Sequence, residues 1–263
     1  MKKQITLLTM LALSISLMAC SSKKEIVKEV PSYIETLSLR DFNAISCSGI
    51  AHVHFTQGNK YSVRKRDGIN IITDITVRNR TLVIETRNRD RNYRGSSKSA
   101  EIWVTAPHLN AITISGVSKF DAPLLQVAEE SIKVSGVCHI KINQLKSDKV
   151  NIFNSGVGSF ECNIESKETT FTNSGTGNAS LTVHSDCLKI SNSGTGKVNA
   201  SFKGDTADFT NKGTGYLFVK VDCKKLTGTN SGIGKFKISG TADDAKINAS
   251  GLSKIDTSEL NHF

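Results

Sequence analysis

The chain of 263 residues has little proline, few aromatic residues and, after its first twenty residues, no long apolar segment. It contains 3 Pro and 1 Trp, and aromatic residues make up 6% of it. A membrane-spanning helix needs about 18 or more consecutive apolar residues, so none is predicted beyond the N-terminus. With 22% charged and 38% hydrophobic residues, the sequence is typical neither of coiled coils nor of disordered chains. Its 20 Gly and many Ser, Thr and Asn residues favour short strands and turns.

The common catalytic and nucleotide-binding motifs are also missing. Gly-x-Ser-x-Gly, His-Glu-x-x-His, the P-loop and the Rossmann fingerprint do not occur. The Asn-Ser-Gly-Thr-Gly segments are not phosphate loops, because no predicted helix follows them. We therefore expect neither an enzyme active site nor a cofactor.

The first twenty residues resemble a bacterial lipoprotein leader. Two lysines precede an apolar stretch over residues 5–17 that is too short to span a bilayer, and Leu-Met-Ala-Cys ends it at Cys20. The resemblance to a lipobox implies a signal peptide over residues 1–19, acylation of Cys20 and a lipidated tether over residues 20–37. Three acyl chains would hold the protein firmly, at about 0.8 kcal/mol per buried CH₂ group. An ordinary secretory signal with a chance cysteine is the alternative.

A repeat of 19 or 20 residues runs through the rest of the chain and is marked by glycines. Four of these eight glycines lie in segments of the form Asn-Ser-Gly-x-Gly, and a fifth lies in Asn-Lys-Gly-Thr-Gly. The marker glycines are Gly116, Gly136, Gly156, Gly175, Gly194, Gly213, Gly232 and Gly251. The segment around Gly49 fits the same frame. Such regular spacing predicts a solenoid of stacked coils.

Within each coil, apolar residues recur with the period of a β-strand. Positions four, six and eight after the marker glycine are mostly apolar, as is the position four before it. The period is too short for a propeller blade and lacks the helix of a leucine-rich repeat. We therefore predict an all-β fold: a single-stranded parallel β-helix, right-handed, with about 19 to 20 residues per coil.

The corners of the coils carry two predictions. The marker glycines are expected to supply either a positive φ or a close backbone approach where the chain bends. The asparagines two positions before five of these glycines fall in one column, and their amides are predicted to form a hydrogen-bonded ladder along the axis. These are Asn154, Asn173, Asn192, Asn211 and Asn230. An asparagine column that binds a ligand is the alternative.

Residues 59–110 interrupt the repeat. The 67 residues between Gly49 and Gly116 equal about three and a half coils, so we predict irregular, longer coils in line with the solenoid. The β-helix domain is expected over residues 38–263, with regular coils over 111–263 and a partial coil after Gly251 as a cap.

These features together resemble the putative auto-transporter adhesin head GIN domain family. The resemblance rests on the leader, the strand pair over residues 42–55, the segment 102–109 leading into 112–116, and the Asn-Ser-Gly-x-Gly coils. It covers about residues 38–255. It implies a β-helical protein of the cell envelope, common in gut Gram-negative bacteria, and supplies no catalytic residues. Unlike an autotransporter, the chain has no C-terminal run of alternating membrane strands.

Stacked acidic residues raise the possibility of a catalytic or Ca²⁺ site. Asp186 and Asp205 share a column, and by counting from the glycines Asp148 and Glu168 share the next. Lysines continue the first column on both sides, so we predict a mixed, solvated edge.

Three histidines could bind Zn²⁺ if they met. His52 and His54 lie on one outward face of a strand, and His139 falls in the column of His52. Because 87 residues and several irregular coils separate His52 from His139, we predict surface histidines and no metal site.

Five cysteines remain after Cys20. They stand at different offsets from their marker glycines, whereas a disulfide needs Cα atoms within about 7 Å. We therefore predict free, largely buried thiols. They are Cys47, Cys138, Cys162, Cys187 and Cys223.

The net charge of +10 is concentrated in residues 60–100, which hold eleven Lys and Arg against four Asp and Glu, a net charge of +7. Such a segment can contact an anionic glycan, lipopolysaccharide phosphates or an acidic envelope protein. A solvated basic loop is the alternative. Nucleic acid is disfavoured by the expected envelope location and by the absence of a predicted aromatic stacking platform. The candidate polyanion-binding residues are Arg78, Arg80, Arg87, Arg89, Arg91 and Arg94.

The sequence thus favours a non-enzymatic outer-membrane lipoprotein whose β-helix presents an extended binding or adhesion surface. The alternatives are a carbohydrate-active β-helix enzyme and a purely structural spacer. The residues after Cys20 lack the acidic run that resembles a surface-export signal, so we expect the protein to face the periplasm.

Overall fold

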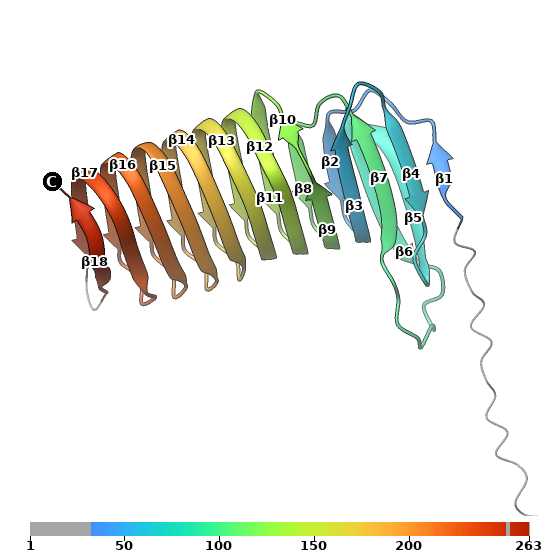
Figure 1. Cartoon of the computed structure of the whole chain (residues 1–263). Helices are drawn as coiled ribbons and strands as arrows, with labels where there is room; N and C mark the ends of the chain where they lie inside the picture. Colours follow the sequence, from blue (N-terminus) through green and yellow to red (C-terminus); the bar gives the residue numbers. More distant parts are fainter. Residues whose placement is uncertain (1–32, 251–252, 263) are drawn as a thin grey trace, which may run out of the picture. The chain divides into compact units, whose positions relative to one another are not determined.

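A computed structural model describes residues 33–250 and 253–262, and every regular element in them is a β-strand. Eighteen strands form one continuous hydrogen-bonded solenoid (Figure 1). No helix in these ranges is long and apolar enough to cross a membrane. The strands are β1 Glu35–Leu37, β2 Ala44–Cys47, β3 Ile50–Gln57, β4 Ser62–Arg66, β5 Ile71–Arg78, β6 Thr81–Asn88, β7 Ala100–Ala106, β8 Ala111–Ile114, β9 Val117–Ala122, β10 Leu125–Gln126, β11 Glu129–Val134, β12 Val137–Asn154, β13 Val157–Asn173, β14 Asn178–Asn192, β15 Lys197–Asn211, β16 Tyr216–Asn230, β17 Phe236–Ala249 and β18 Ile255–His262.

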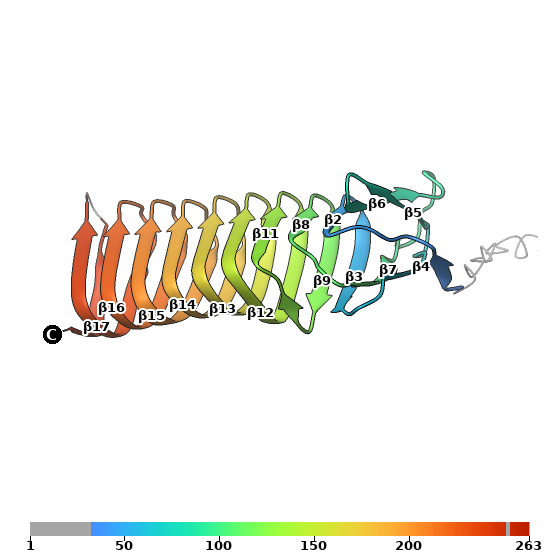
Figure 2. The ribbon, with the colours of Figure 1, turned by 90° about the horizontal axis from the view of Figure 1, so that it is seen from above.

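Each regular coil is one long strand that bends around the core and closes at a glycine corner. β15, for example, pairs in parallel with β14 and β16 along its whole length, including both sides of its bend. Figure 2 shows the two sides as two layers. The outward surface of the side built by β7, β3, β9 and the first halves of β12–β17 is called face A. The outward surface of the opposite side, built by β6, β2, β8, β11 and the second halves of β12–β17, is called face B. The predicted parallel β-helix is confirmed.

The N-terminal coils do not stack in chain order. β2 pairs with both β6 and β8, and β3 pairs with both β7 and β9, so the coil over residues 44–57 lies between two coils that follow it in the sequence. The chain runs outward through β4–β7, where antiparallel pairing of β4 with β1 and β7 and of β5 with β6 forms the end of the stack. Residues 59–110 therefore do not lie between Gly49 and Gly116 in the stack, but continue the solenoid beyond the first coil at its N-terminal end. Gly116 stacks directly on Gly49, as their shared sequence frame predicts.

A β-bulge changes the register of two columns from the one predicted by counting from the glycines. The coil between Gly136 and Gly156 has 20 residues, and its extra residue is accommodated by a register shift between Ile142 and Leu145. Leu145 therefore pairs with Ile164 and is buried, as is Leu125 in the coil before it, whereas Leu124 is 39% exposed. For the same reason Glu168 pairs with Lys149, and not with Asp148 as counting from the glycines predicted.

The marker glycines are required by close packing and not by backbone conformation. Of the two alternatives predicted for the marker glycines, the described ones show the close backbone approach, and Gly240 is the single described glycine with a positive φ. A Cβ atom on Gly194 would overlap the carbonyl oxygen of Gly175 in the coil below, and the same overlap recurs from Gly116 to Gly232. Corner backbones thus stack with no room for a side chain. Gly251 lies outside the described residues.

The predicted asparagine ladder is confirmed. From Asn154 to Asn211 each side-chain Nδ2 donates to Oδ1 of the asparagine in the next coil, at 2.8–3.1 Å, and Asn230 ends the ladder by donating to the carbonyl of Lys254. All five asparagines are buried to within 1% exposure. Because each amide has a partner, burial leaves no polar group unsatisfied there.

The ladder also explains the second glycine of the Asn-Ser-Gly-x-Gly segments. A Cβ atom at Gly158, Gly177 or Gly215 would lie 2.8–3.0 Å from an amide atom of a ladder asparagine. In the coils where an apolar residue replaces the asparagine, as at Ile114 and Val134, a residue with a side chain takes the place of this glycine. Asparagine and second glycine are therefore two parts of one packing arrangement.

Glu130 is the one charged side chain buried in the described core. It lies in the inward column beside Val150, is 1% exposed, and neither carboxylate oxygen has a hydrogen-bond partner. Burial away from water raises the pKa of Glu130 to about 9. The side chain is therefore held protonated at neutral pH.

Replacing Gly194 by valine should destabilise the solenoid, because the new side chain must displace the Gly175 carbonyl and the Asn173 amide. We expect a loss of at least about 2 kcal/mol in the free energy of unfolding, as for other overpacked sites. Thr195→Val is the matched control, because Thr195 is exposed and its replacement should change stability by less than about 0.5 kcal/mol. Equal thermal shifts for the two variants would contradict the corner geometry.

Glu130 should make stability fall as the pH rises. Its pKa is about 9 in the folded chain and near 4.5 when exposed, so the folded state binds more protons between these values. The free energy of unfolding should decrease by up to about 1.4 kcal/mol per pH unit in this window. In Glu130→Leu this dependence should flatten, whereas the exposed control Glu129→Gln should keep it. Denaturant unfolding at pH 5, 7 and 9 measures the difference, and parallel pH profiles for wild type and Glu130→Leu would refute it.

Candidate functional site

The predicted site residues fall in three separate places. Cys20 lies outside the described residues. The six predicted arginines lie on and beyond the β5–β6 hairpin, which extends the face B side at the N-terminal end of the solenoid. The histidines lie on β3 and β12, whose paired first halves belong to face A. The basic segment and the histidines therefore lie on different sides of the solenoid.

The basic hairpin carries its arginines at opposite ends. Arg78 ends β5 and Arg80 lies in the tight turn between β5 and β6, while Arg87 begins the other group at the far end of β6. Eight residues of strand separate the two ends by about 25 Å. All six side chains are exposed, and among the described residues only Arg87 and Arg89 have ionic partners, Asp74 at 3.4 Å and Asp67 at 3.7 Å.

Elsewhere in the solenoid, charges are largely paired between successive coils. Lys141 contacts Glu161 at 3.0 Å and Lys203 contacts Asp222 at 2.9 Å, for example. In the acidic column, Lys224 Nζ forms an ion pair with Asp205 Oδ1 at 2.7 Å. The hydrogen bond to the Asp205 carboxylate raises the pKa of Lys224. Asp148 contacts Lys167 at 3.0 Å, which follows from the bulge. This is the mixed, solvated edge that the sequence predicts.

Face A has an aromatic and cationic platform near its N-terminal end. Trp103 on β7 points outward between the buried Ile102 and Val104, and the guanidinium groups of Arg64 and Arg66 lie over its ring at 5.7 and 5.6 Å. These arginines come from β4, which pairs with β7 in antiparallel register, so that Arg64 lies opposite Trp103 and Arg66 opposite Glu101. The half-buried Trp103 ring thus lies beside two positive charges, and the His54 imidazole stacks 5.8 Å from it.

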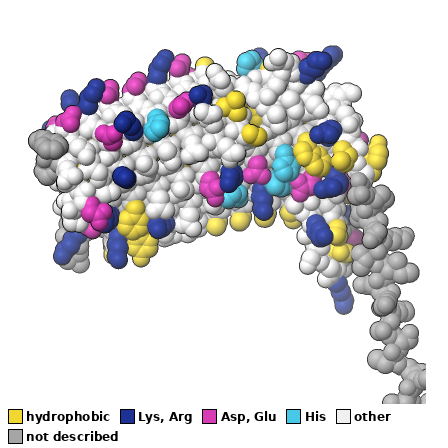
Figure 3. Space-filling view, in the orientation of Figure 1, with side chains coloured by type: hydrophobic (Ala, Val, Ile, Leu, Met, Phe, Trp, Pro, Cys, Tyr) yellow, Lys and Arg dark blue, Asp and Glu magenta, His cyan; other side chains and the backbone are white. Residues whose placement is uncertain are grey.

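A cluster of imidazoles and carboxylates lies beside this platform. His52 and His54 point outward from β3, with ring centroids 3.9 Å apart. Their partners come from the two neighbouring strands: His52 Nε2 contacts Asp121 of β9, and His54 Nε2 contacts Glu101 of β7 at 2.6 Å. Figure 3 shows histidine, acidic and basic side chains gathered with hydrophobic ones over this end of the solenoid. His139 is separated from His52 by Lys119, its register partner on β9.

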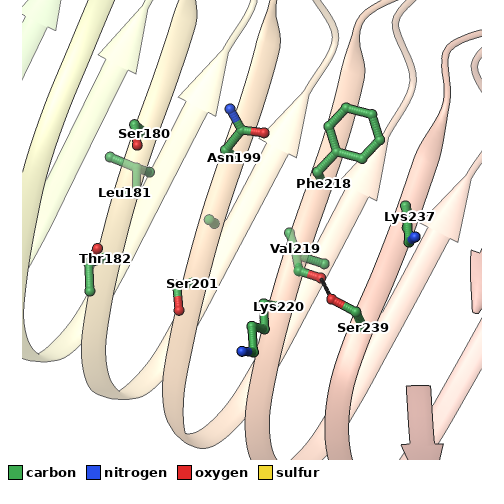
Figure 4. Close-up of a pocket in the computed structure, with 11 residues that line it drawn as sticks. Ser180, Leu181, Thr182, Asn199, Ser201, Phe218, Val219, Lys220, Lys237 and Ser239 are labelled. Atoms are coloured by element: carbon green, nitrogen blue, oxygen red, sulfur yellow. Dashed lines mark hydrogen bonds between the residues drawn. The ribbon is translucent and has the colours of Figure 1, made fainter. Parts of the chain in front are cut away.

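A shallow hollow of about 270 Å³ lies on face A near the other end of the solenoid. Short polar side chains from β14 and β15 form one wall, and Phe218, Lys220 and Lys237 from β16 and β17 form the other (Figure 4). Tyr216 stacks beside Phe218 with centroids 6.2 Å apart, and Lys197 Nζ lies 5.0 Å from the Phe218 ring centre. This is a second aromatic platform with cations around it.

Both platforms are absent from the predicted site residues. Strand periodicity carried the necessary information, because Trp103 alternates with inward Ile102 and Val104, and Phe218 with inward Leu217 and Val219. What the sequence does not show is that Arg64 and Arg66 reach Trp103, since these residues come from an antiparallel strand in the irregular region.

The prediction for the cysteines holds for the described chain. All five thiols are free, and Cys47, Cys138, Cys162 and Cys223 are buried, whereas Cys187 is partly exposed. Burial raises the pKa of the Cys138 and Cys162 thiols to about 12, so they remain protonated and unreactive. These cysteines are core residues.

Comparison with known proteins places the chain in context. Residues 41–203 and 188–262 match the family described as putative auto-transporter adhesin, head GIN domain. A crystal structure of a putative adhesin from Bacteroides fragilis is similar, with 19% identity, a TM-score of 0.60, and coverage of 83% of this chain and 96% of that one. A putative lipid binding protein from Parabacteroides distasonis is similar with 18% identity, a TM-score of 0.64, and coverage of 85% and 95%. At this identity the structures establish the shared fold. No curated protein matches the sequence.

Proposed function

Because the chain belongs to the putative auto-transporter adhesin, head GIN domain family, we propose that it is a non-enzymatic binding protein of the cell envelope whose ligand is an anionic glycan held along face A. The observation that carries the proposal is the presence of two aromatic and cationic platforms on this one face, around Trp103 and around Phe218.

The spacing of the platforms suits an extended polymer. Seven strand spacings separate β7 from β16 on this side, and at about 4.8 Å each they place the platforms about 34 Å apart. Between them the face carries charged side chains such as Lys119 and Lys141 on β9 and β12, and short polar ones such as Asn178, Thr182 and Ser201 on β14 and β15. Sugar rings can pack their apolar faces on the aromatic rings, while hydroxyl groups bond to the polar side chains between them.

Positive charge favours an acidic polymer over a neutral one. Arg64 and Arg66 flank the first platform, and Lys197 and Lys220 lie at the second without an ionic partner in the described chain. The basic hairpin adds a positive field at the N-terminal end, which would attract a polyanion from a distance. By contrast, Asp205 is paired with Lys224, so the described acidic column offers no free carboxylate pair that would favour a glycan-cleaving enzyme.

The localisation that we propose is the periplasmic face of the outer membrane, through a lipid on Cys20. The lipobox-like Leu-Met-Ala-Cys and the absence of an acidic run after Cys20 support this. Protease treatment of intact cells should leave the protein uncleaved, and metabolic labelling with a fatty acid should be lost in Cys20→Ala. Removal of the protein by protease from intact cells would show that it faces outward.

Loss of both platforms should weaken glycan binding. In Trp103→Ala/Phe218→Ala we expect at least a tenfold increase in the dissociation constant for a sulfated glycan or for purified lipopolysaccharide, measured by calorimetry at low salt. Phe153→Ala is the matched control, because Phe153 is an exposed aromatic residue, 43% accessible, on face B. If the control and the double variant bind alike, face A is not the binding surface.

The basic hairpin should contribute through long-range attraction alone. Changing Arg87, Arg89, Arg91 and Arg94 together to Gln should slow association at low salt and have little effect at high salt, because exposed charges are screened within about 8 Å at physiological ionic strength. The fold should be unaffected, since these side chains are exposed. An unchanged association rate at low salt would remove the hairpin from the proposed function and leave face A to be judged by its own variants.

A further inference from the structure

We propose that His52, His54 and Asp121 on face A bind one divalent transition-metal ion of the Zn²⁺ type, with Glu101 as a positioning residue. This site is independent of the glycan surface proposed above, and neither proposal requires the other. The site forms because β3 lies between β7 and β9 in the solenoid, although β3 precedes both strands in the chain.

The ligand atoms are already close enough to converge on one ion. One nitrogen of His52, one nitrogen of His54 and one carboxylate oxygen of Asp121 all lie within 4.8 Å of one another. Zn²⁺ bonds of about 2.0–2.2 Å to nitrogen and oxygen require ligand atoms about 3.4 Å apart in a tetrahedral shell. Small side-chain rotations would therefore bring the three atoms into a coordination shell, without movement of the backbone.

The backbone holds the ligands in place from both sides. His52 and His54 are two residues apart on β3, so both project from face A. β3 is bonded to β7 on one side and to β9 on the other, so Asp121 approaches from a strand that is fixed by its own ladder. The His and Asp side chains are 21–36% exposed, which leaves a coordination position open to water or to another ligand.

Glu101 orients the imidazoles from the opposite side. Its Oε2 lies 2.6 Å from His54 Nε2 and 3.6 Å from His52 Nδ1. A carboxylate that accepts a hydrogen bond from a ring N–H fixes the tautomer and the orientation of a metal-binding histidine. Loss of that carboxylate commonly lowers the metal affinity about 10- to 100-fold. Glu101 therefore acts through the histidines.

The ligand chemistry of the cluster favours a transition-metal ion. Two carboxylates face two imidazoles that are neutral when they bind metal, so the four side chains carry a net charge of −2. Three cations around the cluster offset this charge: Lys119 on β9 opposite His52, Arg66 on β4 opposite Glu101, and Arg64 near the Trp103 ring. Two imidazoles with a carboxylate are a ligand set that Zn²⁺ and its transition-metal neighbours accept, whereas Ca²⁺ and Mg²⁺ prefer oxygen ligands.

A bound ion would join two coils that are not consecutive in the chain, and Glu101 would link a third coil to them through the histidines. Asp121 and the histidines are 67–69 residues apart in sequence, and Glu101 comes from the coil at the capped end of the stack. Because the ligands come together only in the folded state, metal binding should raise thermal stability.

The test uses untagged protein that has been treated with a chelator and then titrated with Zn²⁺. Trp103 is the single tryptophan, and its ring lies 5.8 Å from that of His54, so its fluorescence reports directly on the site. We expect one ion per chain by calorimetry, a change in Trp103 fluorescence that saturates at the same ratio, and a melting temperature that rises with Zn²⁺. Substitution with Co²⁺ should give the visible absorption of a nitrogen- and oxygen-ligated ion.

Conservative variants distinguish a metal site from histidines that contact the two carboxylates without binding a metal. His52→Gln/Asp121→Asn should weaken Zn²⁺ binding at least 100-fold, and Glu101→Gln at least about tenfold while keeping the stoichiometry. His139→Ala, on face A but outside the cluster, should bind as wild type does. The proposal is overturned if wild type binds substantially less than one ion per chain, or if the double variant retains its affinity. Glycan binding measured with the chelated protein is a separate readout, so failure of one proposal is distinguishable from failure of the other.

Discussion

The stacking of one glycine corner on the next is the constraint on which the rest of the solenoid depends. At each corner the backbone lies against the carbonyl of the glycine below, with no space for a Cβ atom. Coils can approach this closely only in one register, and that register then aligns every other column. The inward apolar columns, the asparagine ladder and the charge pairs between coils all follow from it, because each joins a residue to its equivalent 19 or 20 positions away.

The asparagine ladder shows how a polar group can occupy the core of such a stack. Each amide is satisfied by the amide above or below, so an isolated coil could not bury one without leaving hydrogen bonds unmade. The accompanying glycine makes room for the amide, which couples two positions of the repeat. Glu130 has no such arrangement: it is buried alone, and its carboxyl group is kept neutral at the expense of stability at higher pH.

The histidine cluster and one of the two aromatic platforms lie where the repeat is least regular. In the regular coils most charges are paired with a neighbour in the next coil, and the faces are lined with short polar side chains. At the N-terminal end, antiparallel strands and a chain that returns past its own first coil bring together Trp103, two arginines, two histidines and two carboxylates. The platform around Phe218, by contrast, lies in the regular coils, where outward side chains differ from one coil to the next.

The sequence by itself determined the repeat and everything that is periodic within it. The period of two, the glycine spacing and the asparagine column identify the β-helix, its buried residues and the amide ladder, because local pattern and coil-to-coil register coincide there. Only the tertiary structure decided which coils lie next to the coil over residues 44–57. Its strand β3 pairs with β7 and β9, and this choice depends on which of several strands distant in the sequence pair best with it. The tertiary structure also decided the position of the bulge, which moved Asp148 opposite Lys167. The histidine cluster belongs to this second class: His54 and Glu101 are 47 residues apart, and no local pattern records that they meet.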